Sequence, residues 1–184
     1  MKPRYKEEKT AQMAALFLKM RGGKMSYIKL LKLMYMVDRE ALARLGRPVS
    51  YDSFSSMEHG PVLSTTYNRM KGENTFGRPE PAWEKYITTR QGYDVKLKKE
   101  APVSELSAAE IKLIEEVFEQ FGNWYRWKIV DYMHDNFPEW KDPGDSSTPI
   151  DYAEVLRAKQ KSPEETAEIE AEIAGLAVFE RLTA

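Results

Sequence analysis

Residues 25–61, MSYIKLLKLMYMVDREALARLGRPVSYDSFSSMEHGP, carry the sharpest pattern in the chain. On a helical wheel of residues 28–45, one half is apolar and the other half is charged. The apolar half holds Ile28, Leu30, Leu31, Met34, Tyr35, Val37, Ala41, Leu42 and Leu45, and the charged half holds Lys29, Lys32, Arg39, Glu40 and Arg44. We expect this stretch to be a buried central helix, with Ser26 capping its start and Gly46 turning left-handed at its end.

Asp38 is the one charged residue in the middle of the apolar half. Burying an unpaired carboxylate costs several kcal/mol, so the pattern predicts a partner for it. We expect that partner to be His59, a basic side chain, or the free N–H groups of a helix that starts at Pro61. We interpret Asp38 as a structural clamp between the central helix and residues 49–61, and His59-Gly60-Pro61 as a fixed turn. A catalytic role for Asp38 is the alternative.

The composition favours one domain that does not cross a membrane. The chain has 184 residues, 42% of them hydrophobic, which suits a single core. No run approaches the roughly 18 apolar residues of a membrane span, and the charged N-terminus has no apolar signal-peptide core. There is no cysteine, which excludes disulfides, thiolate metal sites and a cysteine nucleophile. We expect a cytoplasmic protein.

Charge is distributed unevenly along the chain. Residues 1–50 carry twelve lysines and arginines against four acids, a net charge of +8, whereas residues 162–184 carry one arginine against six glutamates, a net charge of −5. Such a polarity is consistent with a nucleic-acid face, a partner site, or halves that attract each other. The plainest interpretation is a solvated surface, because the basic residues alternate with core positions.

Periodicity and capping signals predict a mainly α (α+β) fold, a single compact domain of about six or seven helices with a small β-hairpin or short antiparallel sheet. Besides the central helix, we expect helices over residues 5–20, from Pro61 to near Gly72, from a Ser107–Glu110 capping box to Gly122, and over 124–136. The cap signals Asp151–Glu154 and Ser162–Glu165 open a short helix and a C-terminal one. A hairpin is expected over residues 83–98, which should pack on the helices or gain a third strand from residues 53–58. We assign residues 1–161 to the main domain and residues 162–184 to an acidic C-terminal helix packed on it, with Ile169, Ile173, Leu176 and Phe179 as its apolar stripe.

Motifs for catalysis and cofactor binding are missing from the sequence. With only two histidines and no local ligand spacing, we expect no metal site. Asp38, His59 and a serine (Ser55, Ser56 or Ser64) supply the residue types of a hydrolytic triad without its sequence motif. Phosphate loops and a helix-turn-helix pattern are absent. We therefore expect no catalytic residue, no cofactor and no metal.

A protein interface is the remaining class of site. Large apolar residues on the charged side of the central helix and aromatic residues elsewhere are its candidates, since such residues are enriched in interfaces. They are Leu33, Met36, Tyr51, Phe54, Tyr125 and Trp127. The alternative is that they fill the core.

These motifs together resemble the Panacea domain, the SocA-like antitoxin domain that is also met in phage-associated proteins. The resemblance is carried by residues 26–41, by Gly46-Arg47-Pro48-Val49, and by Met57-x-His59-Gly60-Pro61-Val62 with Tyr67. Residues 106–110, 138–143 and 149–152 resemble later segments, so the likeness covers roughly residues 10–160. Met34, Met36 and Val37 replace the leucine and alanine of the family and keep the apolar character.

The resemblance implies a mostly helical antitoxin that binds a toxin encoded beside it, without catalysis of its own. The six interface candidates would then contact the toxin. One branch of the family acts as a proteolytic adaptor that delivers its toxin to a ClpXP protease, which is one alternative. A DNA-binding regulator of its own operon, acting through the basic first 50 residues, is another, and a hydrolase is the weakest. The oligomeric state stays open.

Overall fold

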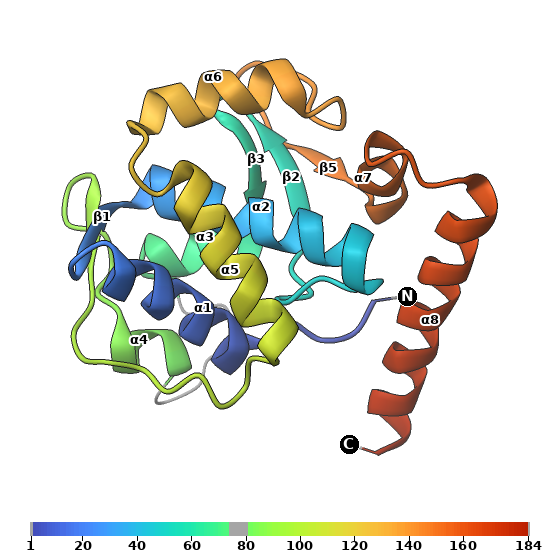
Figure 1. Ribbon diagram of the computed structural model, residues 1–184, viewed down its shortest axis with the longest axis horizontal. Helices are drawn as coiled ribbons and strands as arrows, with labels where there is room; N and C mark the ends of the chain where they lie inside the picture. Colours follow the sequence, from blue (N-terminus) through green and yellow to red (C-terminus); the bar gives the residue numbers. More distant parts are fainter. Residues whose placement is uncertain (1, 74–80, 184) are drawn as a thin grey trace.

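The structure is a computed structural model, which describes residues 2–73 and 81–183 (Figure 1). This part of the chain holds eight helices and two small antiparallel sheets, so the mainly α class with a small sheet is confirmed. The elements are α1 (Glu7–Met20), β1 (Lys24–Ser26), α2 (Tyr27–Leu45), β2 (Phe54–Met57), β3 (Gly60–Leu63), α3 (Ser64–Met70), α4 (Ala82–Tyr86), β4 (Asp94–Lys96), α5 (Ala108–Phe121), α6 (Arg126–Asn136), β5 (Thr148–Ile150), α7 (Tyr152–Ala158) and α8 (Pro163–Leu182).

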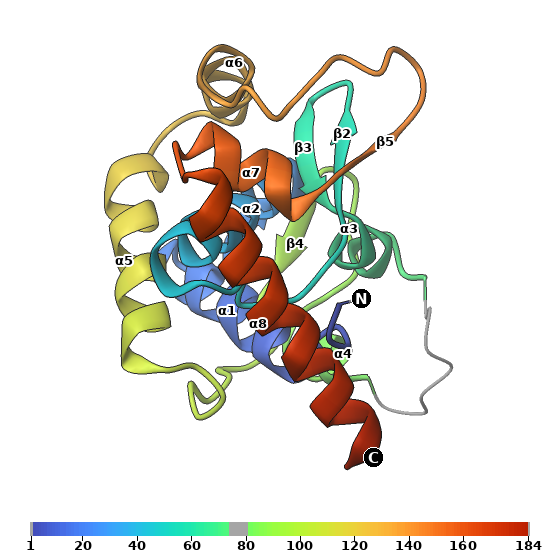
Figure 2. The same cartoon turned by 90° about the vertical axis from the view of Figure 1, so that its right-hand side faces the viewer.

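Helix α2 is the centre of the molecule, as its pattern predicts. It packs against α1, α5, α6, α7 and strand β3, which surround it in both views (Figures 1 and 2). The expectation of a solvated charged side is wrong for Lys29, Lys32 and Arg39, because α5, the β2–β3 hairpin and the segment after α6 cover that side too. Each of the three finds a carbonyl or carboxylate as a hydrogen-bond partner.

The ends of α2 match the sequence only in part. Gly46 adopts the left-handed conformation, with φ of 70°, and so ends the helix as expected. Ser26 stands at the cap position, but its hydroxyl group is buried and makes no hydrogen bond within the described residues. The amide of Tyr27 instead donates to the Tyr93 carbonyl at 2.8 Å, since β4 lies alongside the start of the helix.

The segment around Pro61 is a strand and not the start of a helix. Gly60 to Leu63 form β3, which pairs with β2, and β5 completes this sheet on the other side of β2. Gly60, in the tight turn between the strands, has φ of 96°, a left-handed conformation that favours glycine over other residues. The helix begins three residues after Pro61, at Ser64.

The hairpin expected over residues 83–98 is wrong only at the start of its first arm. Residues 82–86 form the short helix α4, which contacts α1 and carries the fully buried Trp83, and Ile87 just after it is buried too. The second arm is β4, which pairs with β1, and two isolated bridges, Ile87 with Leu97 and Gln91 with Asp94, join residues 87–91 to the second arm. The amide of Ile87 donates to the Trp83 carbonyl at 2.9 Å, which closes a helical turn where the first strand was expected to start.

Helix α8 lies at one edge of the molecule, beside α7 and the N-terminal segment (Figures 1 and 2). Its capping box of Ser162 and Glu165 is formed as the sequence predicts. The expected apolar stripe is only partly covered: Ile173 is buried, whereas Leu176 and Phe179 are 41% and 64% exposed. The neighbouring elements are too short to cover both, because α7 reaches only the first turns of α8.

Candidate functional site

Asp38 joins α2 to the segment that follows it. Its carboxylate accepts hydrogen bonds from the amides of Val49 and Ser50, at 2.8 and 3.1 Å, and from the Ser50 hydroxyl group. Burial raises the pKa of Asp38 to about 7, because desolvation outweighs these hydrogen bonds. The geometry is that of a clamp, although its partners are none of the three that the sequence suggested.

A second buried acid, Asp52, caps the helix after β3. Its carboxylate accepts from the amides of Thr65 and Thr66, at 2.9 and 2.8 Å, and from the Thr66 hydroxyl group. Burial raises the pKa of Asp52 as well. Asp52 therefore caps the helix N-terminus whose N–H groups were one of the three partners suggested for Asp38. Sequence reasoning missed it, because a cap donated from thirteen residues upstream leaves no local motif.

A third buried acid, Glu139, ties the segment after α6 to α2. Its two carboxylate oxygens accept from the Arg39 guanidinium group at 2.5 and 3.2 Å, and Tyr35 donates to it at 3.2 Å. All three side chains are buried. These contacts fix Pro138-Glu139-Trp140 against the centre of the fold, and the Trp140 indole donates to the Met57 carbonyl at 2.8 Å.

The turn at His59, Gly60 and Pro61 lies over Lys32 of α2. The Lys32 ammonium group donates to the Pro61 carbonyl at 2.8 Å, and a Cβ atom on Gly60 would lie 3.2 Å from its Nζ. The turn thus needs glycine both for its backbone conformation and for the approach of Lys32. His59 is exposed and its ring lies 5.0 Å from the Trp127 ring of α6, edge to face.

No hydrolytic triad is assembled from the proposed residues. Asp38 contacts Ser50, His59 faces outward against Trp127, and the Ser55 and Ser64 hydroxyl groups bond to each other at 2.8 Å. Among residues 2–73 and 81–183, no group of three acidic or histidine side chains is placed to hold a metal ion. Within the same ranges, no helix is both long and apolar enough for a membrane span.

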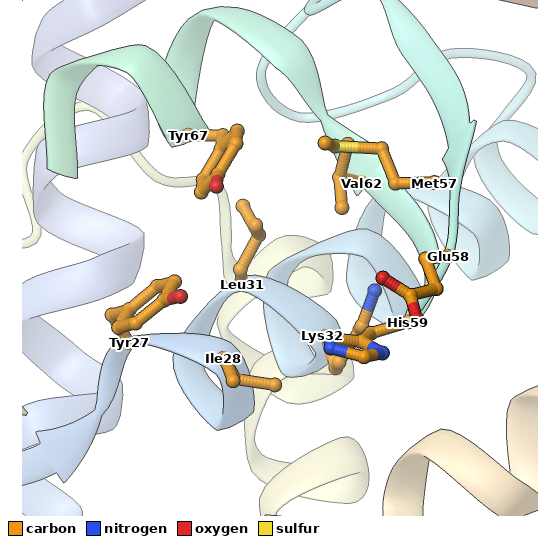
Figure 3. Close-up of a pocket in the computed structure, with 9 residues that line it drawn as sticks. All are labelled: Tyr27, Ile28, Leu31, Lys32, Met57, Glu58, His59, Val62 and Tyr67. Atoms are coloured by element: carbon orange, nitrogen blue, oxygen red, sulfur yellow. The ribbon is translucent and has the colours of Figure 1, made fainter. Parts of the chain in front are cut away.

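A cavity of about 260 Å³ opens beside the turn, between α2, the β2–β3 hairpin and α3 (Figure 3). Its lining comes from the first turns of α2, the hairpin tip and one side of α3: Tyr27, Ile28, Leu31, Lys32, Met57, Glu58, His59, Val62 and Tyr67. The rings of Tyr27 and Tyr67 stack at 6.2 Å. Burial lowers the pKa of Lys32, at the floor, to about 7.

A protein-family model, described as the SocA-like antitoxin, Panacea domain, matches residues 30–141. The chain belongs to this antitoxin family. No curated protein and no solved structure matches it. The matched region contains Asp38, the His59-Gly60-Pro61 turn and Glu139, so the contacts that join α2 to residues 49–50, to the hairpin and to the segment after α6 lie inside it, whereas α8 lies outside it.

Three of the six candidate toxin-binding residues are unavailable to a partner of this antitoxin. Leu33, Met36 and Phe54 are buried, which corrects their assignment to the surface. Phe54 contacts the rings of Tyr35 and Tyr152, at 5.2 and 4.9 Å. Leu33 and Met36 are buried because other elements also cover the charged side of α2, and Met36 lines a cavity that α5 walls.

The other three candidates are accessible but lie on two surfaces. Tyr51 lines a cavity beside α1 and α8. Tyr125 is 62% exposed and Trp127 half-buried, at the start of α6 next to the hairpin. The Arg126 guanidinium group between them lies over three rings, those of Tyr93, Tyr125 and Trp127, at 5.4, 5.4 and 5.6 Å. Sequence reasoning missed Arg126 and Tyr93, because Tyr93 reaches this cluster from a distant loop.

Proposed function

We propose that the protein is an antitoxin that neutralises a protein toxin by binding it directly, without a catalytic step of its own. Membership of the SocA-like antitoxin family is the observation that carries this proposal. The suggested triad is not assembled, because Asp38 bonds to Ser50 and His59 contacts Trp127.

We assign toxin binding to the hairpin–α6 face, defined as His59, Tyr93, Tyr125, Arg126 and Trp127. Tyrosine, tryptophan and arginine dominate the energetic centres of protein interfaces, and this face concentrates all three. The rings and the guanidinium group already contact one another, so little conformational entropy remains to be lost on binding.

The use of the basic residues supports protein binding over DNA binding. Lys29, Lys32 and Arg39 are buried in α2. Of the other nine cations in the first 50 residues, five form ion pairs with acids, namely Lys6, Lys9, Lys19, Lys24 and Arg44. Phosphate binding needs clustered free cations, and each of these ion pairs neutralises one cation.

The test is co-expression of the chain with the product of the adjacent gene. We expect that product to arrest growth alone, to be harmless with the antitoxin, and to co-purify with it. Protection that disappears in cells without ClpXP would indicate the proteolytic adaptor instead. A salt-sensitive shift of the operon promoter by the purified chain would indicate a DNA-binding regulator. A harmless neighbour, or protection without a complex, would contradict direct neutralisation.

A matched pair of substitutions locates the interface. Tyr125→Ala and Phe179→Ala each remove one ring that is almost equally exposed, 62% and 64%, on α6 and α8 respectively. We expect Tyr125→Ala to weaken the toxin complex about tenfold, or about 1.4 kcal/mol, and Phe179→Ala to leave it unchanged. The reverse result, measured by titration calorimetry, would move the interface to α8.

A further inference from the structure

Lys32 is a buried cation that has no acidic partner. Its side chain is 2% exposed, and its one hydrogen bond goes to the Pro61 carbonyl. An ammonium group has three donors, so the carbonyl satisfies only part of its capacity. Within the described residues, no carboxylate lies at ion-pair distance from it.

The two buried arginines of the described residues are paired with acids. Arg39 pairs with Glu139, and Arg69 pairs with Glu7. Lys29, which lies one helical turn before Lys32 and donates to the Gly122 carbonyl, is the one that resembles it. An unpaired buried charge costs several kcal/mol, so a fold that pairs its buried arginines but leaves Lys32 without an acid is less stable than it could be.

The cavity next to Lys32 has the size and walls for one side chain. Its volume of about 260 Å³ is below the roughly 300 to 1,000 Å³ typical of small-molecule pockets. Ile28, Leu31 and Val62 supply apolar walls, and Glu58 and His59 stand at the hairpin tip (Figure 3). A side chain with methylene groups and a charged end suits this shape better than a rigid cofactor.

We propose that this cavity receives an aspartate or glutamate side chain of the toxin, whose carboxylate pairs with the Lys32 ammonium group. This inference rests on the toxin binding proposed above. The complementary charge is the partner that Lys32 lacks, and the apolar walls suit the stem of an acidic side chain. The cavity is continuous with the hairpin–α6 face, since His59 borders the cavity and contacts Trp127.

Binding of a carboxylate would change the protonation of Lys32. Burial lowers its pKa to about 7, so near neutral pH a large fraction of the free antitoxin holds the neutral amine. An acid beside the amine favours the charged form, and the complex takes up a proton as it forms. The other titratable groups around the site are those of Tyr27, Glu58, His59, Tyr67 and His134.

Lys32→Met tests the proposal, with Lys29→Met as the matched control. Both remove a buried lysine of α2 that donates to a carbonyl. Lys29 lines a separate cavity that Tyr125 and Arg126 also border, so Lys29→Met reports the loss of a buried lysine beside the same face without touching the cavity of Lys32. Each change removes a buried cation and also leaves one carbonyl without its donor; these two effects oppose each other, so both variants are expected to fold, as melting curves will show. With the adjacent gene product as the probe, we expect Lys32→Met to weaken the complex at least tenfold and Lys29→Met less than threefold.

Calorimetry in buffers of different ionisation enthalpy adds a readout that loss of packing would not give. We expect wild-type complex formation at pH ~7.5 to take up a proton, and the Lys32→Met complex to take up none. A toxin Glu→Gln or Asp→Asn variant should weaken binding to the wild type but not to Lys32→Met. Equal affinities of wild type and Lys32→Met would overturn this inference alone, whereas no complex with the wild type would overturn the proposed function and this inference with it.

Discussion

Helices α2 and α8 are of almost equal length, 19 and 20 residues, but differ in how much of each is buried. Fifteen residues of α2 are buried, lysines and an aspartate among them, whereas three residues of α8 are. The same wheel analysis errs in opposite directions for the two. It leaves the charged side of α2 in solvent, where other elements cover it, and it buries Leu176 and Phe179 of α8, which are 41% and 64% exposed.

The difference teaches that the position of a helix in the fold decides its burial more than its own pattern does. Helix α2 is surrounded by elements from distant parts of the chain, and its buried polar side chains form hydrogen bonds and ion pairs with them. Helix α8 is held by a capping box and by contacts with α7 and the N-terminal segment. We therefore expect substitutions in α2 to act on the whole fold, and substitutions in α8 to act locally.

Asp38→Ala should have the largest effect on stability. The change leaves the buried amides of Val49 and Ser50 and the Ser50 hydroxyl group without an acceptor, at a cost of about 4 kcal/mol in the free energy of unfolding. Asp38→Asn retains one acceptor oxygen and should lose less. Urea unfolding followed by circular dichroism measures both. A loss below about 1 kcal/mol for Asp38→Ala would show that these contacts do not act as a clamp.

The same chemical change in each helix gives the next comparison. Leu33 of α2 is 0% exposed and Leu182 of α8 is 81% exposed. Leu33→Ala should cost about 3 kcal/mol because it leaves a cavity, and Leu182→Ala less than about 0.5 kcal/mol. Thermal unfolding of the two variants measures both losses of stability. Toxin affinity of folded Leu33→Ala should equal that of the wild type, since Leu33 lies in the core; a specific loss of affinity would return it to the interface.

The pH dependence of stability tests the burial of Lys32. Its pKa is about 7 in the folded protein and 10.5 in the unfolded chain. Between these values the unfolded chain holds a proton that the folded protein lacks, so stability rises with pH. We expect Lys32 to contribute an increase of about 2 kcal/mol between pH ~7 and ~9, and the Lys32→Met variant to lack it. Parallel urea titrations of both proteins at the two pH values will show whether their difference changes.

Local signals in the sequence predict the ends and faces of elements. The capping boxes of Ser107 with Glu110 and Ser162 with Glu165, and the left-handed Gly46, are formed as expected. They are predictable because each involves residues within one helical turn. The short helix α4 and strand β5 were not predicted, since Trp83 and Ile150 adopt their structures through contacts with distant elements.

The candidate site shows the same limit. Asp38 and the His59-Gly60-Pro61 turn stand out in the sequence, and both lie in the region that the family model matches. Their partners do not stand out, because Ser50, Lys32 and Trp127 are identified only when α2, the hairpin and α6 meet. The burial of Lys32 could not be predicted, because Lys32 lies on the charged side of the helical wheel, which we expected to face solvent.

The smallest expected effect is that of the Lys6–Glu180 ion pair, which joins α8 to the N-terminal segment. Both side chains are partly exposed, and such pairs contribute about 0 to 1 kcal/mol. Glu180→Gln should therefore change the free energy of unfolding by less than about 0.5 kcal/mol, and by nothing measurable in high salt.

The same substitution should change amide hydrogen exchange at one position of the N-terminal segment and not at another. The Arg4 amide donates to Glu180 at 3.0 Å and should exchange its hydrogen faster, whereas the Lys6 amide donates to the Ser50 carbonyl at 2.9 Å and should stay protected. Faster exchange at Lys6 as well would mean that α8, and not the clamped segment after α2, holds the N-terminus in place.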